Sequence, residues 1–131
     1  MDGLIIKKKW IDLILEGRKT IEIRGHVSYS HMDGFVYLLE SGTQLVRGTV
    51  RIEGFFTIPN ERSWNDAREM ACLGDVEYHE LVKRYSDPVG YYLCEPNAMN
   101  PVKYLHPAGA VVWVKDVEKL IAGGVKNGGK D

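Results

Sequence analysis

The chain has 131 residues, the size of one domain, and it can bury a hydrophobic core without the help of disulfides or a metal. Its 17 Lys and Arg residues nearly balance its 18 Asp and Glu residues, for a net charge of −1. This balance excludes a protein that coats long duplexes by neutralising many phosphates, but it allows a small local site for a nucleic acid.

The beginning of the chain, residues 1–9, has a short apolar run, but it lacks the long apolar core of a signal peptide. No segment approaches the ~20 apolar residues of a membrane span. Cys72 and Cys94 have no CxxC spacing, which argues against a disulfide framework and a zinc ribbon and suits a reducing compartment. We therefore expect a cytoplasmic protein with no membrane partner, no metal and no cofactor. The oligomeric state is open, with a monomer favoured.

Residues 10–16 predict a short helix buried on nearly all sides, because apolar residues recur at helical spacing and only Asp12 and Glu16 are polar. Gly17 follows at the position where many helices end in a left-handed residue. The chain is therefore expected to turn at Gly17 and to continue as a strand as far as Arg24. Lys19 would then lie at the junction between turn and strand.

Two strands are expected next, at residues 35–39 and 46–52, with a turn at Ser41 and Gly42 after the first. The second alternates apolar and polar residues with a period of two, which is typical of a strand with one solvated face. Gly48 inside this strand predicts a bulge or a tight corner of a barrel.

A helical insertion is expected between residues 60 and 85, divided by Gly74 into two short helices. Asp116 is expected to cap a last helical turn that ends at Ala122, and residues 123–131 predict a flexible Gly-rich tail. Between the insertion and this last turn, Pro96, Pro101 and the turn at 107–109 separate three further expected strands, at residues 89–94, 102–105 and 110–114.

These elements predict an α+β, mainly β fold. About six strands, a short N-terminal helix and the helical insertion indicate a small closed or nearly closed β-barrel, formed by residues 1–122 as a single domain. Side chains fill the interior of a barrel of this size. A ligand site is therefore expected at a mouth of the barrel or in a cleft between barrel and helix.

One segment carries more charge than a half-buried strand normally does, and it reads Gly17-x-Lys19-x-x-Glu22-x-Arg24. Together with the strand 48–52 and the closing stretch His106-Pro107-x-x-Ala110-Val111-Val112-Trp113, this motif resembles the ASCH domain family over nearly the whole chain. The resemblance implies a PUA-like β-barrel associated with RNA. It also implies a cleft that contains the Lys, Glu and Arg of the motif.

Strand geometry sets a condition on this cleft. Side chains alternate along a regular strand, so Glu22 and Arg24 are expected to face one way and Lys19 the other. Lys19 and Glu22 meet only if the backbone departs from a regular ladder, through a bulge or because Lys19 precedes the ladder. A lysine whose stem covers apolar surface while its head stays in water is the alternative for Lys19.

The residues leave three functions open. The favoured one is a module that binds RNA or a modified nucleoside, with Lys19, Glu22 and Arg24 as polar contacts. A hydrolase is the second: the resemblance implies an N4-acetylcytidine amidohydrolase or a ribonuclease, with Lys19 as base and Glu22 assisting. In the amidohydrolase branch a Thr stands three residues after the Lys, and Glu22 occupies that position here, which favours binding. A protein-interaction module is the third, which the resemblance implies because some members of the family occur within transcription coactivators.

Three further residues are candidate ligand contacts. His26 lies just past the motif, Ser41 stands at the end of a strand, and Trp64 offers a stacking surface beside the insertion. His26 also fits an ordinary loop histidine, and Ser41 fits simple turn chemistry. The four histidines show no metal-type spacing with one another or with cysteine, so no metal site is expected.

Overall fold

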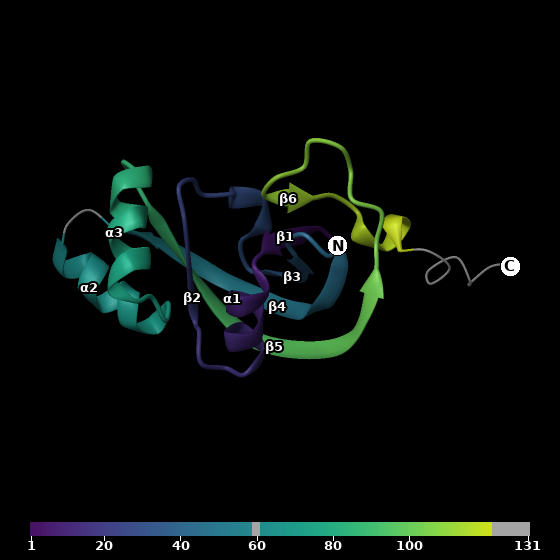
Figure 1. The fold of residues 1–131 in the computed structure, drawn as a ribbon, viewed down its shortest axis with the longest axis horizontal. Coiled ribbons are helices and arrows are strands. Elements are labelled where there is room, and N and C mark those ends of the chain that lie inside the picture. The colour runs from purple at the N-terminus through teal and green to yellow at the C-terminus, as the bar shows by residue number, and fades with distance from the viewer. Residues whose placement is uncertain (59–60, 122–131) are drawn as a thin grey trace, which may run out of the picture.

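The computed structural model describes residues 1–58 and 61–121, which form one six-stranded sheet that curls on itself, with helices beside it (Figure 1). The helices in the described part are α1 (Lys8–Leu15), α2 (Glu61–Met70) and α3 (Asp75–Arg84), with short 3₁₀ turns η1 (Tyr29–His31) and η2 (Val117–Leu120). The strands are β1 (Gly3–Ile6), β2 (Ile21–Arg24), β3 (Gly34–Glu40), β4 (Leu45–Thr57), β5 (Val89–Lys103) and β6 (Trp113–Val114).

The sheet has the strand order β2-β5-β4-β3-β1-β6. Only the β1–β3 pair among these strands is parallel, and the other neighbours are antiparallel. This curled sheet with few helices confirms the predicted α+β, mainly β architecture. No helix in the described ranges is long and apolar enough to cross a membrane.

The interior of the curled sheet is the main core. Alternation along β4 buries Val46, Val50 and Ile52 completely, as the two-residue period predicts. Helix α1 adds Ile11 and Ile14, which are three positions apart and therefore share one face of the helix. The predicted short helix is thus present, as Lys8–Leu15, but the prediction that it is buried on nearly all sides is wrong, because only Ile11 and Ile14 are buried.

Helices α2 and α3 lie outside the barrel beside β2, where they form a second core (Figure 1). Ile21 and Ile23 of β2 pack in this second core with Ala67 and Ala71. Glu22, between them, faces the other way, and all three residues from Ile21 to Ile23 are buried. The insertion therefore covers the apolar face of this edge strand, while Glu22 is buried on the opposite face.

Gly48 lies at the predicted irregularity of β4. The pairing register shifts near it on both sides, between Leu38 and Leu39 of β3 and between Val46 and Gly48 against β5. A Cβ atom at Gly48 would lie 2.4 Å from the carbonyl oxygen of Asn97. The backbones of β4 and β5 therefore approach each other here so closely that only glycine, which has no Cβ atom, fits at position 48.

The prediction of separate strands at 89–94 and 102–105 is wrong, because β5 runs unbroken from Val89 to Lys103. Strand β2 pairs with β5 only as far as Tyr92, so the rest of β5 has an edge without a described neighbouring strand. Neither Pro96 nor Pro101 has a partner in the register with β4. A missing N–H at these positions removes no ladder hydrogen bond, so both prolines are tolerated.

The strand expected at 110–114 is shorter than predicted, since β6 contains only Trp113 and Val114. Ala110 belongs instead to a turn, where its N–H donates to Pro107 O and its carbonyl accepts from His106 Nε2 at 2.8 Å. Asp116 precedes η2 as predicted, but its side chain makes no capping hydrogen bond. Ala122 and the expected tail at 123–131 lie outside the described residues.

Thermal stability is expected to fall in acid. Hydrogen bonds from Lys8 and Arg47 hold the pKa of Asp12 below its usual value of 3.8, and one from Lys9 lowers the pKa of Glu77 below 4.5. Carboxylates with lowered folded pKa values stabilise the fold above their unfolded pKa values. This contribution disappears as the pH falls through the folded values. The melting temperature should therefore decrease progressively below about pH 4.5.

The variant Asp12→Asn provides the control for this prediction. It should melt at a lower temperature than the wild type at pH 7, and its melting temperature should depend less on pH between pH 6 and pH 2. Circular dichroism melts across this range measure both effects. Identical pH profiles for the two proteins would contradict the assignment of the effect to Asp12.

Candidate functional site

The turn between α1 and β2 places Lys19 outside the regular ladder. Gly17 has a φ of +79°, as predicted for the residue that ends the helix. The N–H groups of Arg18 and Lys19 then both donate to Leu13 O, at 2.9 and 3.1 Å. Strand β2 begins only at Ile21, so the side chain of Lys19 does not follow the strand alternation and reaches the face of Glu22.

Glu22 lies between two cations. Its Oε1 is 3.4 Å from Lys19 Nζ, and its Oε2 accepts from Arg24 Nε at 2.8 Å. The Nη2 of Arg24 also donates to Ile5 O at 2.9 Å. Strands β1 and β2 are not neighbours in the sheet, so Arg24 closes the seam where the two sides of the curled sheet meet.

Lys19 is held from the side of the helical insertion as well. Its Nζ donates to Ala71 O at 2.6 Å and lies 4.8 Å from the centre of the Trp10 ring. An aromatic face at this distance attracts a cation. The ammonium is therefore fixed by three elements: β2 supplies Glu22, α1 supplies Trp10, and the segment after α2 supplies Ala71.

The cluster of Lys19, Glu22 and Arg24 carries two positive charges and one negative charge in a buried place. Lys19 is 2% exposed and Glu22 is 6% exposed. Burial lowers the pKa of Lys19 below its usual 10.5, and the negative charge of Glu22 opposes this shift only in part. An anionic or oxygen-rich ligand group would balance the remaining positive charge.

A cavity of about 260 Å³ opens beside Lys19. Apolar side chains form most of its wall, with Lys19, Thr20 and Cys94 as polar members; the lining residues are Ile14, Gly17, Lys19, Thr20, Val50, Leu93, Cys94 and Pro96. Drug-sized ligands occupy roughly 300–1,000 Å³. This cavity therefore suits one small planar group, such as a base, better than an extended molecule.

The other sequence-predicted contacts do not join this cluster. His26 lies beyond the opposite end of β2 and is exposed, and its carbonyl accepts from the Tyr91 hydroxyl at 2.9 Å. Ser41 lines a different cavity, described below. Trp64 belongs to α2, but its side chain is outside the described part of the structure.

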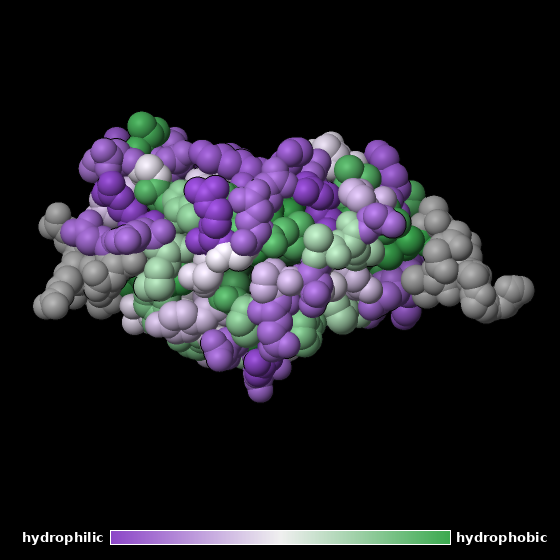
Figure 2. All heavy atoms as spheres, turned by 90° about the horizontal axis from the view of Figure 1, so that it is seen from below, coloured by the Kyte–Doolittle hydropathy of each residue, from purple (hydrophilic) through white to green (hydrophobic). Residues whose placement is uncertain are grey.

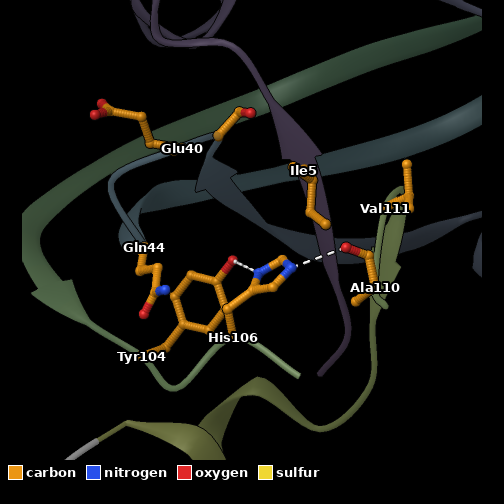
Figure 3. Close-up of a pocket in the computed structure, with 9 residues that line it drawn as sticks. Ile5, Glu40, Gln44, Tyr104, His106, Ala110 and Val111 are labelled. Atoms are coloured by element: carbon orange, nitrogen blue, oxygen red, sulfur yellow. Dashed lines mark hydrogen bonds between the residues drawn. The ribbon is translucent and has the colours of Figure 1, made fainter. Parts of the chain in front are cut away.

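Ser41 lines a second cavity, of about 350 Å³, which shares no lining residue with the first (Figure 3). His106 crosses it between Tyr104 and Ala110, with 2.8 Å hydrogen bonds at both ring nitrogens. Because a carbonyl only accepts, Nε2 donates to Ala110 O, while Nδ1 is hydrogen-bonded to the Tyr104 hydroxyl. His106 therefore holds the turn at residues 107–110 in place. The His-Pro-x-x-Ala spacing puts the carbonyl of Ala110 within reach of the His106 ring.

Sequence reasoning missed two partners of Lys19. One is Trp10, which the pattern of residues 10–16 places at the start of a helix and whose ring lies 4.8 Å from Lys19 Nζ. The other partner is a backbone carbonyl, that of Ala71, and no side-chain pattern marks such a group. Among residues 1–58 and 61–121 no group of three His, Cys, Asp or Glu side chains is placed to hold a metal ion.

The sequence matches no protein-family model, and a search of curated proteins finds no match. Solved structures do resemble the fold. A serine-to-alanine variant of the ASCH protein from Zymomonas mobilis aligns with a TM-score of 0.75 at 15% identity, over 90% of both chains. The ASCH structure from the same organism aligns with a TM-score of 0.74 at 14% identity, over 88% of this chain and 87% of that one.

A tyrosine-to-phenylalanine variant of the same Zymomonas mobilis protein gives a TM-score of 0.75 at 14% identity, over 90% of this chain and 92% of its own. At such low identity the likeness concerns the fold. The chain has the fold of these ASCH structures, as the motif from Gly17 to Arg24 and its context predict.

Proposed function

With this fold as the premise, we propose that the chain binds RNA or a modified nucleoside, and that one base or its phosphate enters the Lys19 cavity. The observation that carries the proposal is the buried excess of positive charge beside an apolar cavity of suitable size. A base offers planar apolar faces to such walls and carbonyl or phosphate oxygens to a cation.

The hydrogen-bonding capacity of Lys19 supports this proposal. An ammonium has three N–H donors. Ala71 O and Glu22 Oε1 account for two of them, and a ligand oxygen would take the third in competition with the cation–π contact to Trp10. Glu22 contacts both Lys19 and Arg24 and keeps the two cations in position. Arg24 is itself anchored, because its Nη2 donates to Ile5 O at the seam between β1 and β2.

Substitution of Lys19 with methionine tests the proposed site. Methionine keeps most of the volume but removes the charge, and a hydrogen bond to a charged group contributes about 1.5–3 kcal/mol. Affinity for a fluorescently labelled single-stranded RNA, measured by anisotropy, should therefore fall about 10- to 100-fold. Calorimetry with cytidine and N4-acetylcytidine measures the same loss for nucleosides.

Lys103→Met is the matched control, because Lys103 Nζ also donates to a backbone carbonyl, that of Thr43, but at an exposed place. This variant should bind RNA like the wild type. Circular dichroism confirms that both variants are folded. Equal affinities of wild type and Lys19→Met for every ligand tested would contradict the proposed function.

A hydrolase is the second candidate, and the lowered pKa of Lys19 is the observation that favours it. A lysine with a lowered pKa is neutral more often near pH 7 and accepts a proton more readily as a general base. Incubation of the protein with N4-acetylcytidine and with RNA, followed by mass analysis of products, distinguishes turnover from binding. Product formation that is lost in Lys19→Met supports the hydrolase.

A further inference from the structure

Three side chains beyond the end of β2 form a chain of hydrogen bonds that the proposed function does not use. His31 Nδ1 is 2.5 Å from Ser28 Oγ, and His31 Nε2 is 2.8 Å from Asp2 Oδ2. These residues are different from those that line the Lys19 and Ser41 cavities. Figure 2 shows the side of the α1–β2 turn, where hydrophilic groups and apolar surface are mixed, whereas η1, which contains His31, lies at the opposite side of the barrel in Figure 1.

The hydrogen bonds give the two nitrogens of the His31 ring different roles. Asp2 is ionised at neutral pH: although burial raises its pKa, the hydrogen bonds from His31 and from Asp116 N hold the pKa below its usual value of 3.8. A carboxylate only accepts, so His31 Nε2 donates to it. In a neutral imidazole the other nitrogen then bears a lone pair, and Nδ1 is the nitrogen that faces the Ser28 hydroxyl.

This arrangement has the three parts of an activated serine nucleophile. A hydroxyl is a weak nucleophile on its own, and a neighbouring imidazole that takes its proton makes it reactive when a third group orients the ring. Ser28, His31 and Asp2 match these three roles at hydrogen-bond distance. Ser30 also lies near the ring, but its Oγ is 3.5 Å from His31 Nδ1, beyond the reach of a direct proton transfer.

The barrel holds both the base and the nucleophile in place. The His31 ring is stacked on Trp113 of β6, with the ring centroids 3.8 Å apart and an interplanar angle of 7°. The N–H of Ser28 donates at 2.8 Å to the hydroxyl of Tyr91, a residue of β5 that is 1% exposed. Ser28 itself is only half-buried, as access by a small substrate requires. Reactive groups on such fixed supports lose little entropy when they reach the productive geometry.

We propose that Ser28 and His31 form a second reactive site, with Asp2 as a positioning residue, and that this site hydrolyses esters of small carboxylic acids. Ser28 Oγ attacks the carbonyl carbon while His31 Nδ1 takes the hydroxyl proton. The bond to the alcohol oxygen then breaks, and His31 gives the proton to the departing alcohol, which leaves the acyl group on Ser28. Water attacks this acyl group, His31 takes a proton from the water, and the acid is released as that proton returns to Ser28. The inference goes beyond the proposed function and does not depend on it.

The test uses a fluorophosphonate probe, which forms a bond to an activated serine as fluoride leaves. We expect mass spectrometry of the digested protein to find the probe on Ser28. His31→Gln should slow this labelling about 10²- to 10⁴-fold, because the variant lacks the base. Ser30→Ala is the matched control, and it should be labelled like the wild type. Circular dichroism confirms that each variant is folded.

Two further measurements address turnover and the role of Asp2. The wild type and Ser30→Ala should hydrolyse 4-nitrophenyl acetate, followed by the absorbance of the released nitrophenol, and Ser28→Ala should lose this activity. Nitrogen NMR of the His31 ring reports which of its nitrogens carries the hydrogen. Asp2→Asn should weaken the preference for hydrogen on Nε2 and slow the labelling of Ser28, an effect that a merely structural Asp2 would not have.

Several outcomes would overturn this inference. It is wrong if the wild type is not labelled at Ser28, or if folded His31→Gln is labelled as fast as the wild type. Ester hydrolysis by Ser28→Ala at the wild-type rate also overturns it, since other side chains then react with the ester. None of these results bears on the Lys19 site, which the RNA affinity of Lys19→Met tests separately.

Discussion

Replacing Glu22 with glutamine should lower the free energy of unfolding by about 3–5 kcal/mol. Glu22 is 6% exposed and is the carboxylate between Lys19 and Arg24. Its removal leaves the buried Lys19 and the partly buried Arg24 facing a neutral amide, whose NH₂ group accepts no hydrogen bond from either cation. Whole domains have unfolding free energies of only 5–15 kcal/mol. The expected loss is therefore a large fraction of the total stability, and urea denaturation at pH 7 measures it directly.

Two further variants make the test specific. Glu53→Gln removes an exposed carboxylate from β4 and should change the stability by less than about 0.5 kcal/mol. The double variant Lys19→Met/Glu22→Gln removes one of the stranded cations as well, so it should be more stable than Glu22→Gln alone. A double variant less stable than Glu22→Gln would show that repulsion between buried cations is not the cause.

The variant Gly48→Ala should lose about 1–3 kcal/mol of stability through overpacking. The added methyl group would lie 2.4 Å from Asn97 O and 3.2 Å from Ala98 Cα, both atoms of the β5 backbone. It would also lie 2.9 Å from a methyl group of Leu15. A flexible side chain can move aside, but two paired strands cannot separate here without losing hydrogen bonds. Urea denaturation again measures the effect.

Gly54→Ala is the control on the same strand. Gly54 has no neighbouring atom within 4 Å of the added Cβ and no positive φ. Alanine also restricts the unfolded chain more than glycine does, so this variant should be unchanged or up to about 1 kcal/mol more stable. Equal losses in the two variants would indicate that glycine matters generally in β4 rather than at the close approach.

The sequence predicted best those features that depend on local pattern. The period of two identified β4, and Gly48 and Gly17 marked a bulge and a helix end from their conformational freedom alone. It failed where the outcome depended on the neighbouring strand. Pro96 and Pro101 suggest a break, and only the pairing shows that β5 has an unpaired edge at these positions.

Some of the candidate site residues also follow from local pattern, and others depend on how distant segments pack. The sequence predicts that Lys19 and Glu22 meet only through a bulge or because Lys19 precedes the ladder; in the structure Lys19 precedes the ladder, and Glu22 contacts both Lys19 and Arg24. Ser41 and His26 were grouped with them because each stands near a strand end. Strand ends lie at two sides of a barrel, however, and the sequence does not indicate which of them adjoin the same cavity.

The bond from Arg24 to Ile5 O has a consequence for the dynamics of the barrel. The seam between β2 and β1 is closed there by a side chain, whereas neighbouring strands in the sheet are joined by backbone ladders. Glu22 positions this guanidinium and also contacts Lys19. Local opening of the seam therefore disturbs the charge cluster, and a ligand that stabilises the cluster raises the free energy of that opening. The side chains that would bind a ligand thus also hold the two sides of the barrel together.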